Sequence, residues 1–366
     1  MASIGTGILA FTNRGEGVLR DPANSFRPSP KDVRVPRQLI QKHRLCEGAR
    51  LEGPTRTGRH GPELREVDTV AGLPPKEFAE RATLEKLTAV DPTVRFHLSA
   101  TNKLSMRVVD LIAPIGRGTR GLIVAPPKAG KTILLMDLAH AIRHDDPTVR
   151  IICLLIDERP EEVTHFRRSV DAEVLASSKD HSPADHVNLA RLTLAHLRTE
   201  LECGRHLVVL VDSLTRMGRA FNAVGSGSRR TMSGGLEAGV MEVPRRFFGL
   251  ARAIEGGGSV TIIATALVET GSRMDELIFQ EFKGTGNSEV VLDRSLAESR
   301  IFPAIDVTTS GTRKEALLYD PDEERRVWMI RKALAGRKPA NAMQALIRSL
   351  EQFPSNQALL ETIALD

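Results

Sequence analysis

The sequence predicts an α/β protein in which a mainly parallel β-sheet is preceded by a small all-β barrel. Three observations support this prediction. Long apolar runs recur between residues 121 and 293, with helical patterning between them. Residues 5–66 hold short β-like runs broken by glycine, proline, asparagine and aspartate. A loop that ends in Gly-Lys-Thr joins the first long apolar run to a helix.

The long runs are apolar along their whole length, which is typical of parallel strands covered on both faces. They span residues 121–125, 150–157, 206–212, 259–267 and 288–293. Because helical segments separate them, right-handed βαβ units are expected. Two further helices are expected near the carboxyl terminus, over 326–334 and 340–353.

The short β-like runs span residues 7–11, 17–20, 32–36, 49–53 and 64–70. Short strands with turn residues at this spacing predict a small barrel. The chain is therefore expected to divide into a barrel over 1–68, a linker over 69–105 and an α/β domain over 106–366. One short helix is expected in the linker, over 78–87.

Composition excludes several classes of protein. Charged residues are 27% and apolar residues 41%, which is ordinary for a globular protein. No run approaches the roughly 20 apolar residues that span a bilayer, and no secretory signal is seen, so a cytoplasmic protein is expected. The cysteines, which suggest neither a disulfide framework nor a zinc site, are Cys46, Cys153 and Cys203.

The net charge of +5 is concentrated at one end of the chain. Residues 1–66 contain 12 basic and 7 acidic residues, whereas the remainder contains 39 of each. A basic barrel attached to a neutral domain favours an anionic polymer as partner, although a merely solvated basic surface would have the same composition.

The loop at residues 121–132, GLIVAPPKAGKT, has the strand-loop-helix order of a phosphate-binding P-loop. Gly130 lets backbone N–H groups close around a polyphosphate at a helix N-terminus. Lys131 can reach the β- and γ-phosphates, and the Thr132 hydroxyl can ligate Mg²⁺. Ala125 stands where the usual first glycine would be.

Two acidic residues follow other apolar runs. Asp212 ends the run at 206–212, where a P-loop protein needs a carboxylate for Mg²⁺. Glu158 follows the run at 150–157 and is a candidate base for the attacking water, with Arg159 beside it as a γ-phosphate sensor. Because parallel strands end at the same edge of a sheet, these groups are expected beside the P-loop. The alternative is that the charges only cap a helix.

Other segments combine glycine with cations. Arg313 lies in the loop TTSGTRKEA, where it could act as an arginine finger or be only an exposed arginine. The loops at 225–235 and 282–287 suit contacts to a phosphate backbone, and their cations are Arg229, Arg230 and Lys283.

At these segments the chain resembles the bacterial transcription termination factor Rho family, whose members are hexameric RNA-dependent ATPases of the RecA-like class. The resemblance covers roughly residues 107–335. It is carried by residues 120–132, 154–164, 211–224, 245–287 and 300–318, with DERPEEVT, EFKGTGN and SGTRKE as its most specific segments.

The resemblance implies a nucleotide site for ATP and Mg²⁺. It assigns Mg²⁺ to Thr132 and Asp212 and the catalytic base to Glu158. Arg313 resembles a finger donated across a subunit interface, Arg159 and Arg216 resemble phosphate sensors, and Phe302 matches an aromatic that stacks on adenine. The phosphate loop itself would comprise Pro127, Lys128, Ala129, Gly130, Lys131, Thr132 and Ile133.

The resemblance also implies a path for single-stranded RNA. The loop at 225–237, with Arg229 and Arg230, resembles one RNA-gripping pore loop, and Lys283 with Gly284 resembles a second. The barrel resembles the family's OB-like RNA-binding domain over roughly residues 5–70, and Arg20 and Arg34 are its implied RNA contacts.

The barrel departs from the family pattern. Glu16, Val18 and Arg34 replace aromatics that stack on bases in the family. Each lost base stack removes roughly 1–3 kcal/mol of affinity for single strands. Binding is therefore expected to be more sensitive to salt and less selective for pyrimidines than in the family.

Together these features predict a homohexameric transcription termination factor that hydrolyses ATP, translocates 5′ to 3′ on nascent RNA and releases transcripts from the RNA polymerase elongation complex. No membrane partner is expected. Two alternatives are a ring ATPase of the protein-export or rotary class and a regulatory paralogue that binds RNA or polymerase. The basic barrel and FKGTGN disfavour the first, and the complete set of catalytic candidates disfavours the second.

Overall fold

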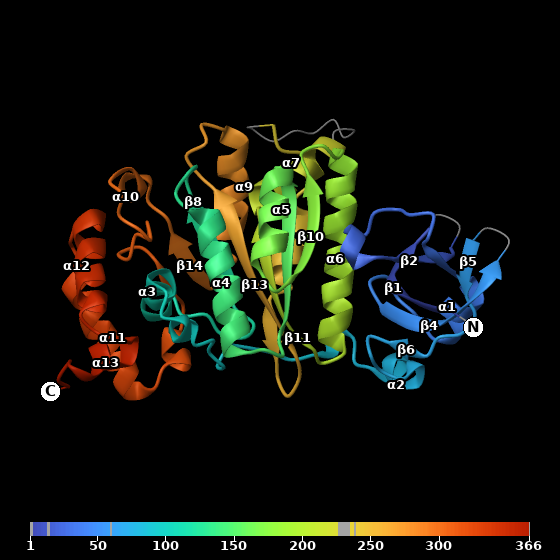
Figure 1. Cartoon of the computed structure of the whole chain (residues 1–366), viewed down its shortest axis with the longest axis horizontal. Helices are drawn as coiled ribbons and strands as arrows, with labels where there is room; N and C mark the ends of the chain where they lie inside the picture. Colours follow the sequence, from blue (N-terminus) through green and yellow to red (C-terminus); the bar gives the residue numbers. More distant parts are fainter. Residues whose placement is uncertain (1–2, 13–14, 59–60, 226–234, 238, 366) are drawn as a thin grey trace.

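The structure is a computed structural model of the 366-residue chain, and it describes residues 3–12, 15–58, 61–225, 235–237 and 239–365. Figure 1 shows the barrel at one end, a large sheet with helices on both faces in the middle, and the carboxyl-terminal helices at the other end. The predicted combination of an all-β barrel and a mainly parallel α/β domain is confirmed.

The barrel is a closed sheet in the order β1-β2-β3-β5-β4, in which β4 returns to pair with β1 and β6 extends β4. Leu9, Leu51 and Leu64 fill its interior and are fully buried. Its strands are β1 (Ile4–Phe11), β2 (Gly17–Arg20), β3 (Val33–Val35), β4 (Arg50–Gly58), β5 (Gly61–Leu64) and β6 (Thr69–Val70), with the short helices η1 (Pro22–Asn24) and α1 (Arg37–Lys42) between them.

The large sheet has the order β10-β9-β11-β13-β8-β14-β15. All neighbours from β10 to β14 are parallel, so the loops after β8, β9 and β11 meet at one edge. The strands are β8 (Arg120–Ala125), β9 (Arg150–Glu158), β10 (Glu173–Ser178), β11 (His206–Asp212), β13 (Ser259–Leu267), β14 (Ser288–Val291) and β15 (Gly311–Thr312), with β7 (Ala89–Val90) and β12 (Arg252–Ile254) beside β13.

Helices cover both faces of this sheet. Alternate residues of its strands point to opposite faces and enter two separate apolar cores. On β9, Ile151 and Leu155 face one core, whereas Ile152 and Leu154 face the other. One face carries α3 (Leu104–Ile112), α4 (Lys131–Asp145), α5 (Pro160–Ser169) and α10 (Arg294–Glu298), and the other carries α6 (Pro183–Glu202), α7 (Leu214–Gly225), α8 (Glu242–Gly249) and α9 (Arg273–Lys283). The carboxyl-terminal helices α11 (Pro321–Leu334), α12 (Pro339–Glu351) and α13 (Asn356–Glu361) extend the first core by packing on α3, on α10 and on one another. Among the described residues, no helix has the length and apolar character to cross a membrane.

The predicted helix over 78–87 is wrong. The chain forms α2 (Pro75–Glu80) and the separate single turn η2 (Leu84–Lys86), with Arg81 in an extended conformation between them. The side chain of Arg81 donates to the carbonyl of Phe78 and to Glu202 of α6, contacts that a continuous helix would not provide. The connection from 69 to 105 also contains β7, η3 (Leu98–Thr101) and the start of α3, so it packs on the large domain.

A buried polar contact joins the barrel to the large domain. The N–H at Nδ1 of His196, on α6, donates to the carbonyl of Gly48 over 2.8 Å, and Nε2 accepts from Arg150 over 2.8 Å. At Gly48, φ is +84° and a Cβ would lie 2.2 Å from the backbone of Ala195, so only glycine permits this approach. Burial, together with Arg150, lowers the pKa of His196 to about 3.

We expect this contact to make the fold sensitive to acid. The folded-state pKa of His196 is about 3, whereas histidine in an unfolded chain titrates near 6.5. Between these pH values the unfolded chain therefore binds a proton at this residue and the folded chain does not. The contribution of His196 to the free energy of unfolding is therefore fully present well above pH 6.5. It falls as the pH drops towards 3, by about 2 kcal/mol at pH 5. Thermal melting between pH 7.5 and 5 should show a smaller loss for His196→Gln. An equal loss in both proteins would contradict the assignment.

Candidate active site

The phosphate loop joins the end of β8 to α4. Gly130 precedes the helix with φ of +95°, a conformation that favours glycine, and a Cβ there would meet no atom within 4 Å. The N–H groups of Lys131, Thr132 and Ile133 form the first turn and have no acceptor within the helix. The loop therefore presents free donors at the positive end of a 15-residue helix.

Lys131 is bound to the two predicted acids. Its Nζ lies 2.5 Å from Oδ2 of Asp212 and 3.3 Å from Oε1 of Glu158. Asp212 is fully buried and Glu158 is 1% exposed. The sheet order β9-β11-β13-β8 accounts for the arrangement, because the acids end β9 and β11 at the edge where the loop follows β8.

Further contacts fix the orientation of both carboxylates. The Thr265 hydroxyl donates to Oδ1 of Asp212 over 2.8 Å. Arg216 lies 3.0 Å from Oε1 of Glu158 and donates to the carbonyl of Asp157. Three of the predicted catalytic residues, Lys131, Glu158 and Arg216, are therefore connected through one carboxylate.

The charges in this cluster favour a protonated lysine. Burial opposes the ammonium form of Lys131, but Asp212 and Glu158 outweigh burial and raise the pKa of Lys131 above its usual value. The cluster thus holds a cation that can exchange its carboxylate partners for the oxygens of a phosphate.

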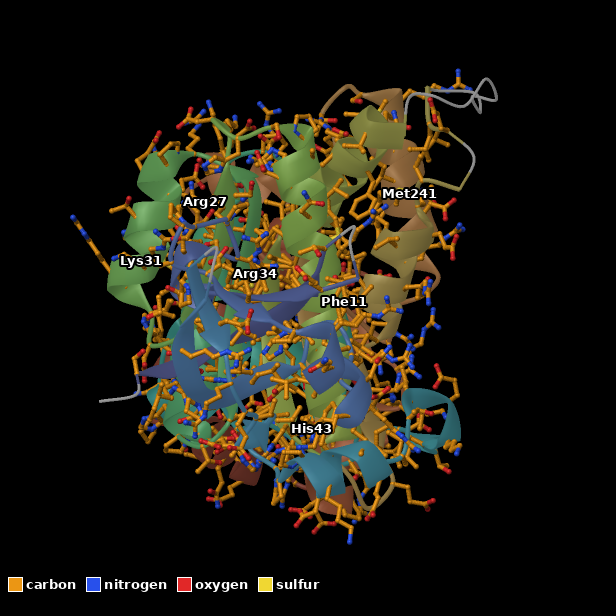
Figure 2. All side chains as sticks on the ribbon, turned by 90° about the vertical axis from the view of Figure 1, so that its right-hand side faces the viewer. Phe11, Arg27, Lys31, Arg34, His43 and Met241 are labelled. Atoms are coloured by element: carbon orange, nitrogen blue, oxygen red, sulfur yellow. The ribbon has the colours of Figure 1, made fainter. Side chains whose placement is uncertain are left out.

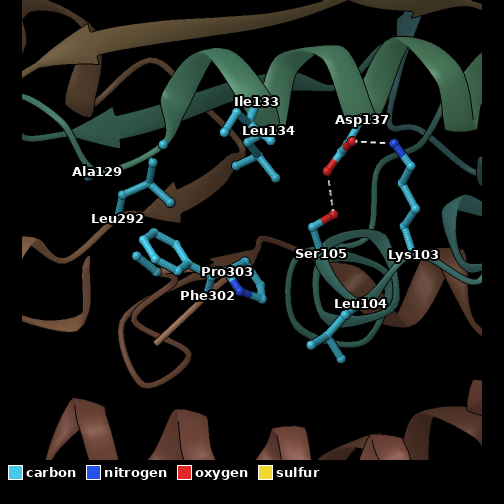
Figure 3. Close-up of a pocket in the computed structure, with 12 residues that line it drawn as sticks. Lys103, Leu104, Ser105, Ala129, Ile133, Leu134, Asp137, Leu292, Phe302 and Pro303 are labelled. Atoms are coloured by element: carbon cyan, nitrogen blue, oxygen red, sulfur yellow. Dashed lines mark hydrogen bonds and ion pairs between the residues drawn. The ribbon is translucent and has the colours of Figure 1, made fainter. Parts of the chain in front are cut away.

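A pocket of about 390 Å³ opens beside the phosphate loop. Figure 3 shows Phe302 across the pocket from Ile133 and Leu134 of α4. Phe302 is 49% exposed and Ile133 is 63% exposed, so both offer apolar surface to a planar ring. The size and apolar lining suit the base of a nucleotide.

Polar groups that the sequence did not reveal line the far side of the same pocket. The hydroxyl of Ser105 donates to Oδ2 of Asp137 over 2.7 Å, and Lys103 donates to Oδ1 over 2.6 Å (Figure 3). These residues come from the start of α3 and the middle of α4, and no motif surrounds them. Only the fold brings them to the same pocket as Phe302.

The chemistry of the loop fits Mg²⁺. Magnesium keeps several waters and uses one or two protein oxygens together with phosphate oxygens. Thr132 and Asp212 would supply such a pair, one from the first turn of α4 and one from the end of β11. Among the described residues, no group of three or more His, Cys, Asp or Glu side chains could hold a metal without a phosphate.

Arg313 is not brought to this cluster within one chain. It follows β15, which pairs with the amino end of β14, whereas the phosphate loop follows the carboxyl end of β8, roughly 13 Å further along the sheet. Arg313 is exposed and, in the described residues, makes no ion pair with a carboxylate. Arg159 is also exposed, at the start of α5.

Arg313 shares a surface pocket of about 760 Å³ with Lys283 and Gly284. Asn287 connects the two segments, because its carbonyl accepts from the N–H of Arg313 over 2.7 Å. Asn287 also exchanges two hydrogen bonds with the backbone of Arg120, the first residue of β8. Arg229 and Arg230 lie outside the described residues.

The two barrel arginines implied to bind RNA are each paired with an acid. Arg34 lies 2.5 Å from Oε2 of Glu16, and Arg20 is paired with Asp32. Glu16 and Arg34 are two of the positions where the resemblance expects aromatics, so an ion pair occupies that surface. The expected salt sensitivity and weaker pyrimidine preference stay predictions.

A parallel sheet with a Gly-Lys-Thr loop, two buried acids and a base-sized pocket at one edge defines a P-loop ATPase of the RecA-like class. The nucleotide-binding domain of the ATP synthase alpha/beta family matches residues 105–312, and the Rho termination factor RNA-binding domain matches residues 5–76. Transcription termination factor Rho of Aquifex aeolicus is 48% identical over 98% of this chain and 84% of its own length. The chain belongs to the transcription termination factor Rho family.

A second relative agrees with this membership, and a solved structure agrees with the fold. Transcription termination factor Rho of Pseudomonas aeruginosa is 44% identical over 98% of this chain and 87% of its own length. The solved structure of a prototypical ATPase from the type III secretion system of pathogenic bacteria superposes with a TM-score of 0.64 at 22% identity, covering 84% of this chain and 92% of that one. This second likeness shows the fold alone.

Proposed function

We propose that this protein is a transcription termination factor that hydrolyses ATP in response to RNA, translocates 5′ to 3′ along the nascent transcript and releases it from RNA polymerase. The observation that carries the proposal is the contact of Lys131 with both Asp212 and Glu158, in a chain that resembles Rho along almost its whole length. In this proposal residues 1–68 bind RNA, 69–105 connect, and 106–366 form the motor.

The proposed site divides the work of hydrolysis among its residues. Lys131 and the N–H groups of the loop bind the β- and γ-phosphates, and Lys128, exposed on the same loop, adds a second cation. The base lies in the pocket against Phe302. Thr132 and Asp212 would hold Mg²⁺, which supplies positive charge to the phosphate oxygens.

Glu158 is placed to handle the attacking water. Its carboxylate is held by Lys131 and Arg216, so its orientation is set before a substrate arrives. It orients the water and accepts its proton as the water oxygen bonds to the γ-phosphorus, while the bond to the β–γ bridging oxygen breaks and ADP leaves. Arg216 and Arg159 then lie near the phosphate as sensors of its presence.

A neighbouring subunit supplies the remaining positive charge at the γ-phosphate. Arg313 is exposed and distant from Lys131 of its own chain, which supports a site shared between subunits of a homohexamer. Lys283 and Gly284 lie in the same pocket as Arg313, so a loop that contacts RNA is adjacent to the arginine that completes the next site.

ATP hydrolysis with and without single-stranded RNA tests the proposal. We expect little turnover of ATP without RNA and strong stimulation by an unstructured polyribonucleotide. Glu158→Gln should bind ATP but respond to no RNA, which excludes a contaminating ATPase. Hydrolysis that is rapid and unaffected by RNA would contradict an RNA-dependent motor and favour the protein-export or rotary class.

A further inference from the structure

A groove of about 460 Å³ separates the barrel from α6. Its walls come from the end of β1, the turn after η1 and the first half of α6, so one wall belongs to the barrel and the other to the motor. Phe11, Arg27 and Arg191 line it and are exposed. None of them belongs to the nucleotide site.

Phe11 offers a stacking surface inside this groove. It is 45% exposed, whereas the two other aromatic residues of the first 80, Phe26 and Phe78, are buried. Its backbone is fixed, because its N–H donates to Glu47 over 3.2 Å. Proteins that bind single strands stack the bases on exposed aromatic rings.

Arg27 contacts a histidine ring and no carboxylate among the described residues. Its guanidinium lies 2.8 Å from Nε2 of His181, and Nδ1 of His181 accepts from the N–H of Ser178 over 2.9 Å. A guanidinium carries five N–H donors, so Arg27 has others for a phosphate oxygen.

Arg191 supplies a cation on the opposite wall. Its guanidinium lies 5.7 Å from the centre of the Phe221 ring, and it contacts no carboxylate in the part of the chain that the structure describes. The two acids of the groove are already engaged, Glu47 by the N–H of Phe11 and Asp185 by the capping box with Ser182. Neither acid forms an ion pair with Arg27 or Arg191 among the described residues.

We propose that this groove binds single-stranded RNA, with a base on Phe11 and phosphates on Arg27 and Arg191. The inference rests on the proposed function and names where the RNA is captured. Figure 2 labels Phe11, Arg27 and Arg34 in the view from the barrel end of the molecule. The Glu16–Arg34 ion pair occupies the surface where aromatics are expected, and the groove provides an aromatic and unpaired cations instead.

Binding of a short fluorescent oligouridine to the full chain, without nucleotide, tests the groove. Phe11→Ala should weaken binding by about tenfold or more, because it removes a base stack. Arg27→Ala and Arg191→Ala should each weaken binding and reduce the dependence of log affinity on log salt by about 0.7. Lys31→Ala is the matched control, because Lys31 is exposed on the same barrel but outside the groove (Figure 2).

A photocrosslink locates the RNA independently of any variant that fails to fold. An oligonucleotide with 4-thiouridine should label peptides that contain Phe11 or Arg191. Labels confined to Val33–Val35, or equal losses of affinity for Lys31→Ala and Arg27→Ala, would overturn the groove. Unchanged affinity in all three groove variants, with ATP hydrolysis still stimulated by RNA, would overturn the groove alone. If the unaltered chain binds no RNA, the proposed function fails with it.

Discussion

Replacement of Arg313 by alanine is expected to lower ATP turnover by about 10³–10⁵-fold while ATP binding survives. The reason is geometric. Arg313 is exposed and lies near the amino end of β14, a strand length away from the phosphate loop of its own chain. In the proposed mechanism it therefore stabilises the transferring phosphoryl group in a neighbour's site and plays no part in holding ATP on Lys131.

Two binding measurements and a control variant accompany the hydrolysis assay. A fluorescent ATP analogue should bind the variant with near-normal affinity. ADP with aluminium fluoride, which imitates the transition state, should no longer bind more tightly than ATP. Lys314→Ala is the matched control, because it removes the adjacent cation, which is paired with Asp91. Normal hydrolysis by Arg313→Ala would show that the shared site is wrong.

Replacement of Lys131 by alanine is expected to abolish turnover and to destabilise the chain before any nucleotide is added. Asp212 is fully buried and Glu158 is 1% exposed, and Lys131 is a cation that contacts both. Removing one partner of a buried ion pair leaves an uncompensated charge and costs about 3–5 kcal/mol. Arg216 still compensates Glu158, so the loss falls mainly on Asp212.

A double-mutant cycle separates the two effects. Asp212→Asn removes the unpaired charge, so Lys131→Ala combined with Asp212→Asn should melt at a higher temperature than Lys131→Ala alone. Neither variant should hydrolyse ATP. If Lys131→Ala melted like the wild type, the pairing of Lys131 with Asp212 would not hold in solution.

The strands of the motor were predictable because they are apolar throughout. The predicted runs 206–212 and 259–267 coincide with β11 and β13. By contrast, β10 (Glu173–Ser178) escaped prediction because it lies at the sheet edge and half of its residues are polar or charged. The helix over 78–87 was predicted from local pattern, whereas contacts of Arg81 with Glu202, far along the chain, decide the structure there.

The candidate site was predictable where a motif carried it. Lys131, Asp212 and Glu158 follow apolar strands, and parallel pairing alone brings them together. The wall formed by Ser105 and Asp137 was not predictable, because it requires the packing of α3 on α4. The sequence identified Glu16 and Arg34 as departures from the family, but their pairing depends on the neighbouring positions of β2 and β3.

Asn287 has a consequence for communication around a ring. Its hydrogen bonds join Arg313 to Arg120, and Arg120 begins the strand whose other end leads into the phosphate loop. This strand is paired with β13 from Arg120 to Ala125, and close-packed interiors transmit strain. We therefore expect each subunit to connect two ATP sites rigidly, the one to which it contributes Lys131 and the one to which it contributes Arg313. A structural change at one subunit interface should then alter the next interface.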